Sequence, residues 1–214
     1  MKKLILKTVI IAMFTTVAFS QEFAQTNQEL SKKTSFKSQT EKQSVDRPNT
    51  IGSTLWVLAN AFDDPDHFYK LSYGYQITEK ENLIVDLSTW TYNEPLGEYG
   101  SADEFYPGDV KAFGIGFGYQ RFLWKKSFAT LHATNFLQKF RDKEGEKIQS
   151  GYQLYLQLIV GYRFEFFNKR WYLEPAYSFR YWPVNTNFPE SFDSIERGKN
   201  NYIIEPSLNF GFRF

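Results

Sequence analysis

Apolar and polar side chains alternate along much of the chain after about residue 50. In the last segment, one face would carry Tyr202, Ile204, Leu208, Phe210, Phe212 and Phe214. The other face would carry Asn201, Glu205, Ser207, Asn209, Gly211 and Arg213. A period of two predicts a β-strand, and so many large rings on one face indicate contact with hydrocarbon.

This pattern predicts eight antiparallel strands, at 51–61, 67–77, 82–92, 109–122, 127–139, 150–166, 171–183 and 201–214. Each is long enough to cross a bilayer as a tilted strand. After the first connection, the long loops 93–108, 140–149 and 184–200 alternate with short turns at 78–81, 123–126 and 167–170. Short turns at one end and long loops at the other are typical of an outer-membrane barrel.

The first 49 residues do not follow this pattern. Residues 1–20 read as a signal peptide, with Lys2 and Lys3 before a mostly apolar run that ends at Ala18-Phe19-Ser20. Residues 21–49 are polar and poor in large apolar side chains, which predicts a disordered periplasmic tail. The predicted barrel therefore occupies 50–214.

Composition narrows the class of protein further. The chain has no cysteine, its net charge is +1, and aromatic residues make up 19% of it. These values give no electrostatic basis for nucleic-acid binding and no thiol chemistry. After residue 20 no apolar run is long enough for a membrane-spanning helix, so a soluble secreted β-protein and an outer-membrane barrel are the two classes left.

Strand number, loop asymmetry and the ending Asn209-Phe-Gly-Phe-Arg-Phe214 resemble the small eight-stranded barrels typified by the transmembrane domain of outer membrane protein A. The resemblance covers about residues 50–214. It implies an all-β, eight-stranded antiparallel up-and-down transmembrane barrel in the cell outer membrane. It also implies that the assembly machinery of that membrane recognises Phe210, Phe212 and Phe214.

The alternation places eight charged residues inside the barrel, four basic and four acidic: Lys70, Asp86, Arg163, Glu165, Glu174, Arg180, Glu205 and Arg213. A tight turn at 167–170 would set Arg163 opposite Glu174. Arg180 with Glu205 is a second predicted pair. An eight-stranded barrel is just wide enough for side chains to fill, so these charges predict a plug, with a narrow passive pore as the alternative.

A segment on the fifth predicted strand, Leu131-His-Ala-Thr-Asn135, is similar to the His-x-Ser-Asn segment of the lipid A 3-O-deacylases. That resemblance implies His132 as base, Thr134 as nucleophile, and Glu146, or else Glu144, as the acid. Threonine stands where serine is expected, and the facing of this strand is left open by its poor alternation. The structural alternative is that His132 is an ordinary strand residue.

The sequence thus predicts an integral outer-membrane β-barrel with a mostly plugged lumen, exposed external loops and a structural or interaction role. An acyl hydrolase, a narrow pore and a soluble carrier are the alternatives. Its expected partners are outer-membrane lipid, lipopolysaccharide and the assembly machinery, with no nucleic acid. No cofactor and no metal site are predicted.

Overall fold

The computed structural model of this chain describes residues 46–61 and 67–214. The predicted signal peptide and nearly all of the predicted tail lie outside these residues. In the described part the strands are β1 (Asn49–Thr54), β2 (His67–Thr78), β3 (Glu81–Tyr92), β4 (Gly108–Phe122), β5 (Ser127–Asp142), β6 (Lys147–Tyr162), β7 (Phe164–Phe166), β8 (Trp171–Asn185) and β9 (Tyr202–Arg213). The helices described are η2 (Leu55–Ala61), η3 (Leu96–Glu98) and α2 (Glu190–Glu196).

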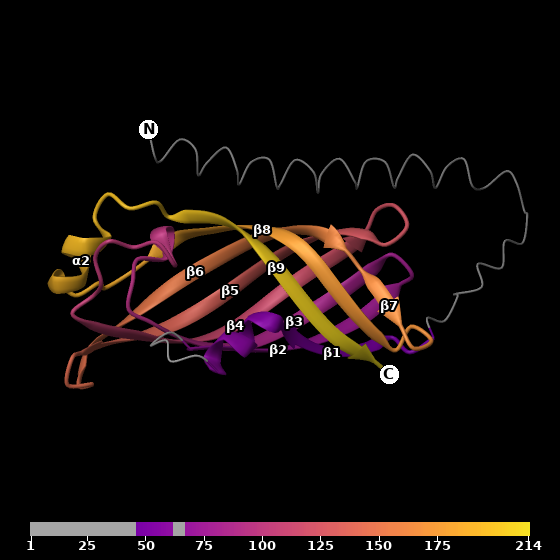
Figure 1. Cartoon of the computed structure of the whole chain (residues 1–214), viewed down its shortest axis with the longest axis horizontal. Helices are drawn as coiled ribbons and strands as arrows, with labels where there is room; N and C mark the ends of the chain where they lie inside the picture. Colours follow the sequence, from indigo (N-terminus) through magenta and orange to yellow (C-terminus); the bar gives the residue numbers. More distant parts are fainter. Residues whose placement is uncertain (1–45, 62–66) are drawn as a thin grey trace, which may run out of the picture. The chain divides into compact units, whose positions relative to one another are not determined.

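The strands form one antiparallel sheet that closes on itself (Figure 1). Their order is β6-β5-β4-β3-β2-β1-β9-β8-β7, and β8 also pairs with β6. Because β7 continues β6 after a break at Arg163, the nine described strands make an eight-membered barrel wall. The predicted all-β, eight-stranded, up-and-down barrel is confirmed.

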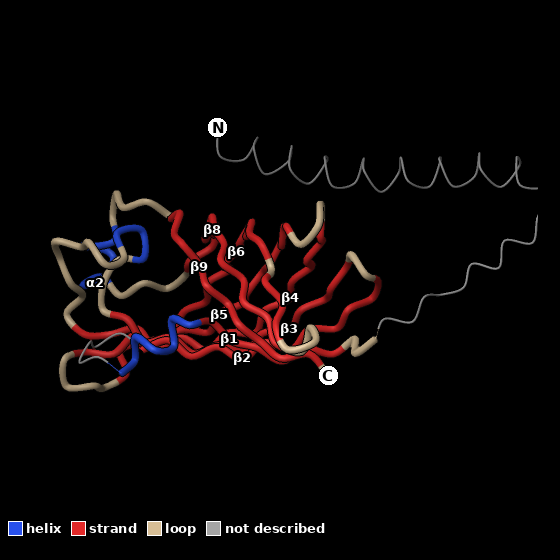
Figure 2. The backbone as a smooth tube through the Cα atoms, turned by 45° about the vertical axis from the view of Figure 1, so that its right-hand side comes forward, coloured by secondary structure: helices blue, strands red, loops and turns tan. Residues whose placement is uncertain are grey.

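The two ends of the barrel differ (Figures 1 and 2). Tight turns join β2 to β3, β4 to β5 and β7 to β8 at the end where the chain finishes. The last of these turns holds Phe167, Asn168 and Lys169 at positive φ, which reverses the chain within a few residues. The longer loops, with η3 and α2, gather at the other end.

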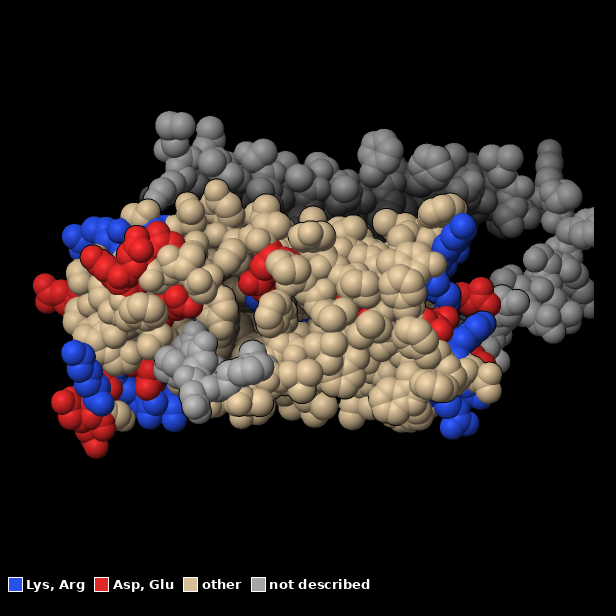
Figure 3. Space-filling view, viewed as in Figure 1, with Lys and Arg blue, Asp and Glu red and all other residues tan. Residues whose placement is uncertain are grey.

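The wall has an apolar exterior, and its interior holds both paired charged groups and buried aromatic rings. On the face that Figure 3 shows, most of the middle of the barrel is uncharged, and most charged side chains lie at its two ends. Along β4 the exposed side chains include Phe113, Ile115 and Phe117, whereas the positions between them are buried. This is the reverse of a soluble β-protein and matches what a lipid-facing strand requires. No helix among the described residues has the length and hydropathy needed to cross a bilayer.

Two predicted strands differ from those observed. The predicted strand 51–61 ends at Thr54 and continues as η2, because Leu55 to Leu58 are consecutively apolar and do not alternate. The predicted strand 150–166 is interrupted at Arg163, opposite the region of Pro175.

Pro206 pairs with Tyr177 in a continuous β8–β9 register. In the described residues, β1 pairs with β9 only between Asn209 and Arg213, so the edge of β9 at Pro206 faces no neighbouring strand. A missing backbone donor is tolerated at an open edge.

Candidate functional site

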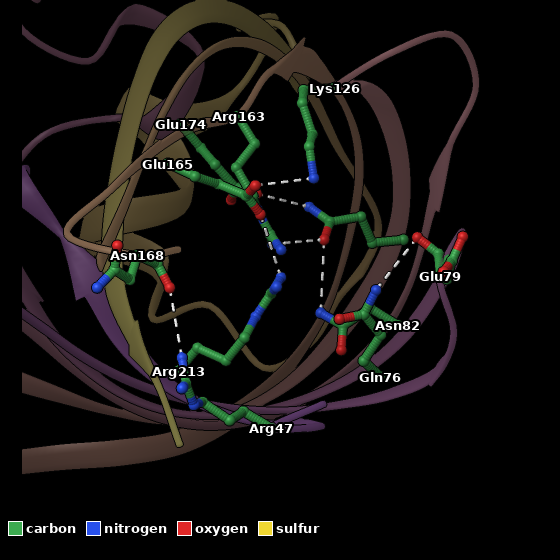
Figure 4. Close-up of polar contacts among 11 residues, drawn as sticks. Arg47, Gln76, Glu79, Asn82, Lys126, Arg163, Glu165, Asn168, Glu174 and Arg213 are labelled. Atoms are coloured by element: carbon green, nitrogen blue, oxygen red, sulfur yellow. Dashed lines mark hydrogen bonds and ion pairs between the residues drawn. The ribbon is translucent and has the colours of Figure 1, made fainter. Parts of the chain in front are cut away.

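The lumen near the tight turns is filled by a hydrogen-bonded ionic network (Figure 4). Arg163 is 2% exposed, and its Nε lies 2.7 Å from Glu174 Oε1. Arg163 Nη2 donates to Gln120 Oε1 at 2.9 Å, and Gln120 Nε2 donates to Glu174 Oε1 at 3.1 Å. Asn82 Nδ2 donates to the same Gln120 oxygen at 3.4 Å. We call Asn82, Gln120, Arg163 and Glu174 the plug.

Two aromatic rings lie against the Arg163 guanidinium. Its guanidinium carbon lies 4.3 Å from the ring centroid of Tyr172 and 4.7 Å from that of Phe122. Stacking on rings suits a planar guanidinium. The Tyr172 ring in turn packs over Gly52 and Gly211, where a Cβ would lie 2.9 and 2.3 Å from its hydroxyl. These glycines make room for the ring at the junction of β1 and β9.

A second ionic group surrounds Glu165 next to the plug. Lys126 Nζ lies 2.8 Å from Glu165 Oε2, and Arg213 Nη2 lies 3.4 Å from Glu165 Oε1. The register that pairs Glu165 with Tyr172 sets this carboxylate inward. A cavity of about 50 Å³ lies against the plug, enough for a few water molecules.

Asp86 is the acidic centre of the middle of the lumen. It is 2% exposed, and its Oδ2 lies 2.9 Å from Lys70 Nζ and 2.9 Å from His132 Nε2. On the other side of the imidazole, His132 Nδ1 lies 3.3 Å from Thr134 Oγ1. Asp86, His132 and Thr134 therefore form a carboxylate–imidazole–hydroxyl chain across β3 and β5.

The predicted triad is corrected by this geometry. His132 and Thr134 come together inside the barrel, but the carboxylate beside His132 is Asp86 and neither Glu146 nor Glu144. Both glutamates lie exposed on the loop after β5. Since this loop begins ten residues along the strand from His132, it is about 33 Å away along the wall.

Glycines on β4 make space for His132. A Cβ at Gly116 would lie 2.4 Å from His132 Cε1, and a Cβ at Gly118 would lie 2.5 Å from His132 Cδ2. The alternating glycines Gly114, Gly116 and Gly118 therefore leave space on the inner face of β4, and the imidazole packs there. These alternating glycines could have predicted, from the sequence, an inward-facing ring on the neighbouring strand β5.

Arg180 and Glu205 form an ion pair between β8 and β9, deeper toward the loop end. Arg180 Nη1 also donates to the hydroxyl of Tyr155 at 3.4 Å. With this pair, all eight charged residues predicted for the interior are joined in four pairs: Lys70–Asp86, Arg163–Glu174, Glu165–Arg213 and Arg180–Glu205.

At the loop end, aromatic residues of the loops pack against one another and against β5. Phe192 of α2 is fully buried and stacks on Tyr106 at 4.8 Å between ring centroids. Phe192 and Phe188 also contact Phe140 of β5, at 5.5 and 4.9 Å. We call Tyr106, Phe140, Phe188 and Phe192 the lid. Aromatic pairs of this kind stabilise a fold by more than the apolar area that they bury would contribute.

The carboxyl group of Glu196 contacts the lid and has a raised pKa. Its carboxylate accepts a hydrogen bond from the Tyr106 hydroxyl at 2.5 Å. Burial raises the pKa of Glu196 above its usual value, and the carboxylates of Asp193 and Glu98 raise it further; the Tyr106 hydrogen bond and Lys199 act in the opposite direction. Burial and the Glu196 carboxylate likewise raise the pKa of Tyr106.

We expect the lid to loosen as pH rises from acid toward neutral. A carboxyl whose pKa is raised in the folded state stabilises that state at low pH and loses this contribution as pH passes the raised pKa. Hydrogen exchange of 186–201, corrected for the intrinsic rate, should therefore increase with pH. Glu196→Gln should abolish this dependence, whereas Glu190→Gln, at an exposed position of the same helix, should keep it. The prediction is wrong if Glu196→Gln retains the full pH response.

Phe210 and Phe212 lie on β9, and Phe214 directly follows its last residue. Phe212 contacts Trp171 at 5.1 Å and stacks with Phe214 at 6.4 Å between centroids. Phe214 is half exposed. These rings lie on the outer wall at the end with the tight turns; their role in assembly stays a prediction.

Between the plug and the lid lies a cavity of about 370 Å³. Aromatic and charged side chains from several strands line it, among them Trp90, Tyr155, Lys70, Asp86 and Arg180. Among the described residues, no group of three or more potential ligands is arranged to hold a metal ion.

A closed eight-stranded wall with an apolar outside and paired charges inside has the fold of the small outer-membrane β-barrels. Among solved structures, the chain is similar to Neisserial surface protein A, with 14% sequence identity and a TM-score of 0.42; the match covers 78% of this chain and 94% of that one. No family model matches the sequence, and no curated protein matches it.

Proposed function

We propose that this chain is an integral protein of the outer membrane, closed to solutes along its axis and presenting its long loops outside the cell. One observation carries this proposal: large apolar side chains face outward around the wall, while the charged side chains within are paired. Water-soluble sheets bury their rings, and a wide channel leaves its charges hydrated. The neighbours expected from this arrangement are membrane lipid and lipopolysaccharide.

Closure is supported at two levels of the lumen. The plug joins β3, β4 and β8 with the β6–β7 junction at Arg163, through buried hydrogen bonds and an ion pair near the tight turns. The lid covers the loop end with buried rings. A solute moving along the axis would have to disrupt both layers, so a structural or interaction role suits the geometry better than transport.

Conductance measurements test closure directly. The folded barrel in a planar bilayer should give no discrete current steps, and neither should Phe192→Ala, because the plug remains. A narrow pore would instead show steps that change with Arg163→Ala or Glu174→Ala. Steps of that kind would overturn the proposed function, provided that heat-modifiable migration in electrophoresis shows the sample to be folded.

Export is a separate part of the proposal. Fractionation of expressing cells should place the chain in the outer membrane. Phe214→Ala should lower the amount that reaches the folded, heat-modifiable form, if the assembly machinery reads Phe210, Phe212 and Phe214. Phe167→Ala, which removes another exposed ring at the same end, is the matched control.

A second candidate function is ester hydrolysis, favoured by the contacts of His132 with Asp86 and Thr134. In this reaction Thr134 Oγ would bond to the acyl carbon of an ester and give its proton to His132. The alcohol would leave with that proton, and water would then release the acid and free Thr134. Mass spectrometry of lipid A from expressing cells should show loss of an acyl chain that His132→Ala prevents; unchanged lipid A removes this candidate for that substrate.

A further inference from the structure

The barrel wall is incomplete beside β1. This strand ends at Thr54, so it pairs with β2 only as far as Ser72 and with β9 only as far as Asn209. Within the described residues, no strand lies between His67–Leu71 of β2 and Tyr202–Leu208 of β9. These stretches belong to the half of the barrel nearer the long loops.

The helix η2 covers only the β2 side of this opening. The Asn60 side chain accepts a hydrogen bond from Phe68 N at 2.9 Å and donates one to Phe68 O at 2.8 Å. These two bonds replace the ones that a neighbouring strand would make with the backbone of Phe68. On the β9 side, the Thr54 hydroxyl donates to Leu208 O at 3.2 Å, and Pro206 has no N–H to be satisfied. At Phe68 and at Pro206–Leu208 the two edges therefore do not need a neighbouring strand, as a lipid environment demands.

The cavity between the plug and the lid reaches this opening. Its lining includes Trp56 and Asn60 of η2, Phe68 of β2, and Pro206 and Ser207 of β9. Figure 3 shows a hollow on this face, in which acidic and basic atoms are visible inside the otherwise uncharged wall. A molecule in the surrounding membrane would thus meet a side entrance lined by rings.

Deep in the cavity, polar atoms lack a protein partner. Trp90 is 8% exposed and stands among the rings of Phe68, Tyr99 and Tyr155, at centroid distances of 5.7, 5.6 and 6.4 Å. Its indole Nε1 has no hydrogen-bond partner among the described residues, and neither has the buried Oδ1 of Asp86. An unsatisfied buried donor and acceptor together favour a ligand that both accepts and donates a hydrogen bond.

The charges of the cavity exclude a charged head group. Lys70 is paired with Asp86, and Arg180 with Glu205. Any added charge would therefore lie near a like charge as well as an opposite one, and would lose its hydration without gaining a free counter-charge. An uncharged head bearing a carbonyl and hydroxyl groups loses far less on entry.

We propose that this cavity binds an uncharged single-chain amphiphile, of the class of fatty acyl esters of a small polyol, which enters sideways between η2 and β9. A volume of about 370 Å³ is at the lower end for small-molecule sites, so the head group and the first part of the chain fit inside. The rest of the chain extends through the opening into the bilayer. This inference rests on the proposed membrane location.

Native mass spectrometry of the folded full-length barrel tests the proposal. The probes are 1-monomyristoylglycerol, myristate and lysophosphatidylcholine with the same chain, each at the same concentration. We expect one monomyristoylglycerol per barrel and binding at least about 10-fold weaker for the two charged or zwitterionic probes. Equal binding of all three would overturn the uncharged-head assignment.

Two variants at adjacent positions locate the site. Ser88 is buried and lines the cavity, whereas Thr89 faces outward on the same strand. Ser88→Phe should fill the cavity and abolish binding of 1-monomyristoylglycerol, and Thr89→Phe should leave it unchanged. If both bind equally, the probe lies elsewhere and the proposal fails.

A milder variant tests the same site in case Ser88→Phe does not fold. Trp90→Phe keeps a ring and removes the indole donor, so the affinity for 1-monomyristoylglycerol should fall about 2- to 10-fold, as expected for one hydrogen bond. Unchanged affinity would contradict the assigned role of Trp90. A folded, non-conducting, membrane-inserted barrel that binds no probe would overturn this inference and leave the proposed function intact.

Discussion

Replacing Arg163 by alanine should cost about 3–5 kcal/mol of unfolding free energy, because it leaves the buried Glu174 carboxylate without its counter-charge. The Gln120 carbonyl oxygen would lose its arginine donor as well. Urea unfolding of the barrel in lipid vesicles, followed by tryptophan fluorescence, measures the loss.

A double replacement separates pairing from packing. Arg163→Met with Glu174→Met removes both charges and should recover most of the lost stability, since an apolar pair needs no desolvated ions. Arg121→Ala is the matched control, because Arg121 makes an exposed pair with Glu81 at 3.7 Å and should be silent. If Arg163→Ala is as silent as Arg121→Ala, the plug does not hold the lumen together.

Replacing Phe192 by alanine should cost about 3–5 kcal/mol locally, as for other fully buried phenylalanines. The loss should be confined to the lid, because Phe192 contacts Tyr106 and Phe140 and lies beyond the strand ladders. Hydrogen exchange should show faster opening of 186–201, with the strands unchanged.

Phe105→Ala provides the comparison. Phe105 is adjacent to Tyr106 but 57% exposed, so its removal should leave the exchange of 186–201 as it was. Global unfolding of the barrel with Phe192→Ala would contradict the view of the lid as a separate layer.

Most strands of the wall could be predicted from the sequence, because apolar outward side chains and inward side chains alternate along each of them. The predicted strands 67–77, 82–92 and 171–183 agree with the observed β2, β3 and β8 to within two residues at each end. Pairing across a tight turn was equally accessible, since the turn at 167–170 fixes the register of Glu165 with Tyr172.

The failures have physical causes. The run Leu55 to Leu58 carries no alternation, so its length suggested a strand although the chain turns away as η2. The lid depends on packing between distant loops, which no local pattern encodes.

The carboxylate beside His132 was also missed. Its identification needs two successive registers, Asp86 with Gly116 and Gly118 with His132. Only the second register follows a tight turn, because β3 and β4 are joined by the long loop 93–107, whose length does not fix their register. The contact between Asp86 and His132 therefore could not be found by counting along the sequence. The resemblance to a deacylase segment implied Glu146 instead, which lies on an exposed loop.

The open stretch of β9 also affects the behaviour of many copies at high density. A bare strand edge is a template on which another molecule can add a strand, leading to fused or aggregated material. Pro206 interrupts that template, because an imino acid gives an incoming strand nothing to accept. Pro206, which lies at the open edge of β9, thus also opposes strand addition between neighbouring barrels.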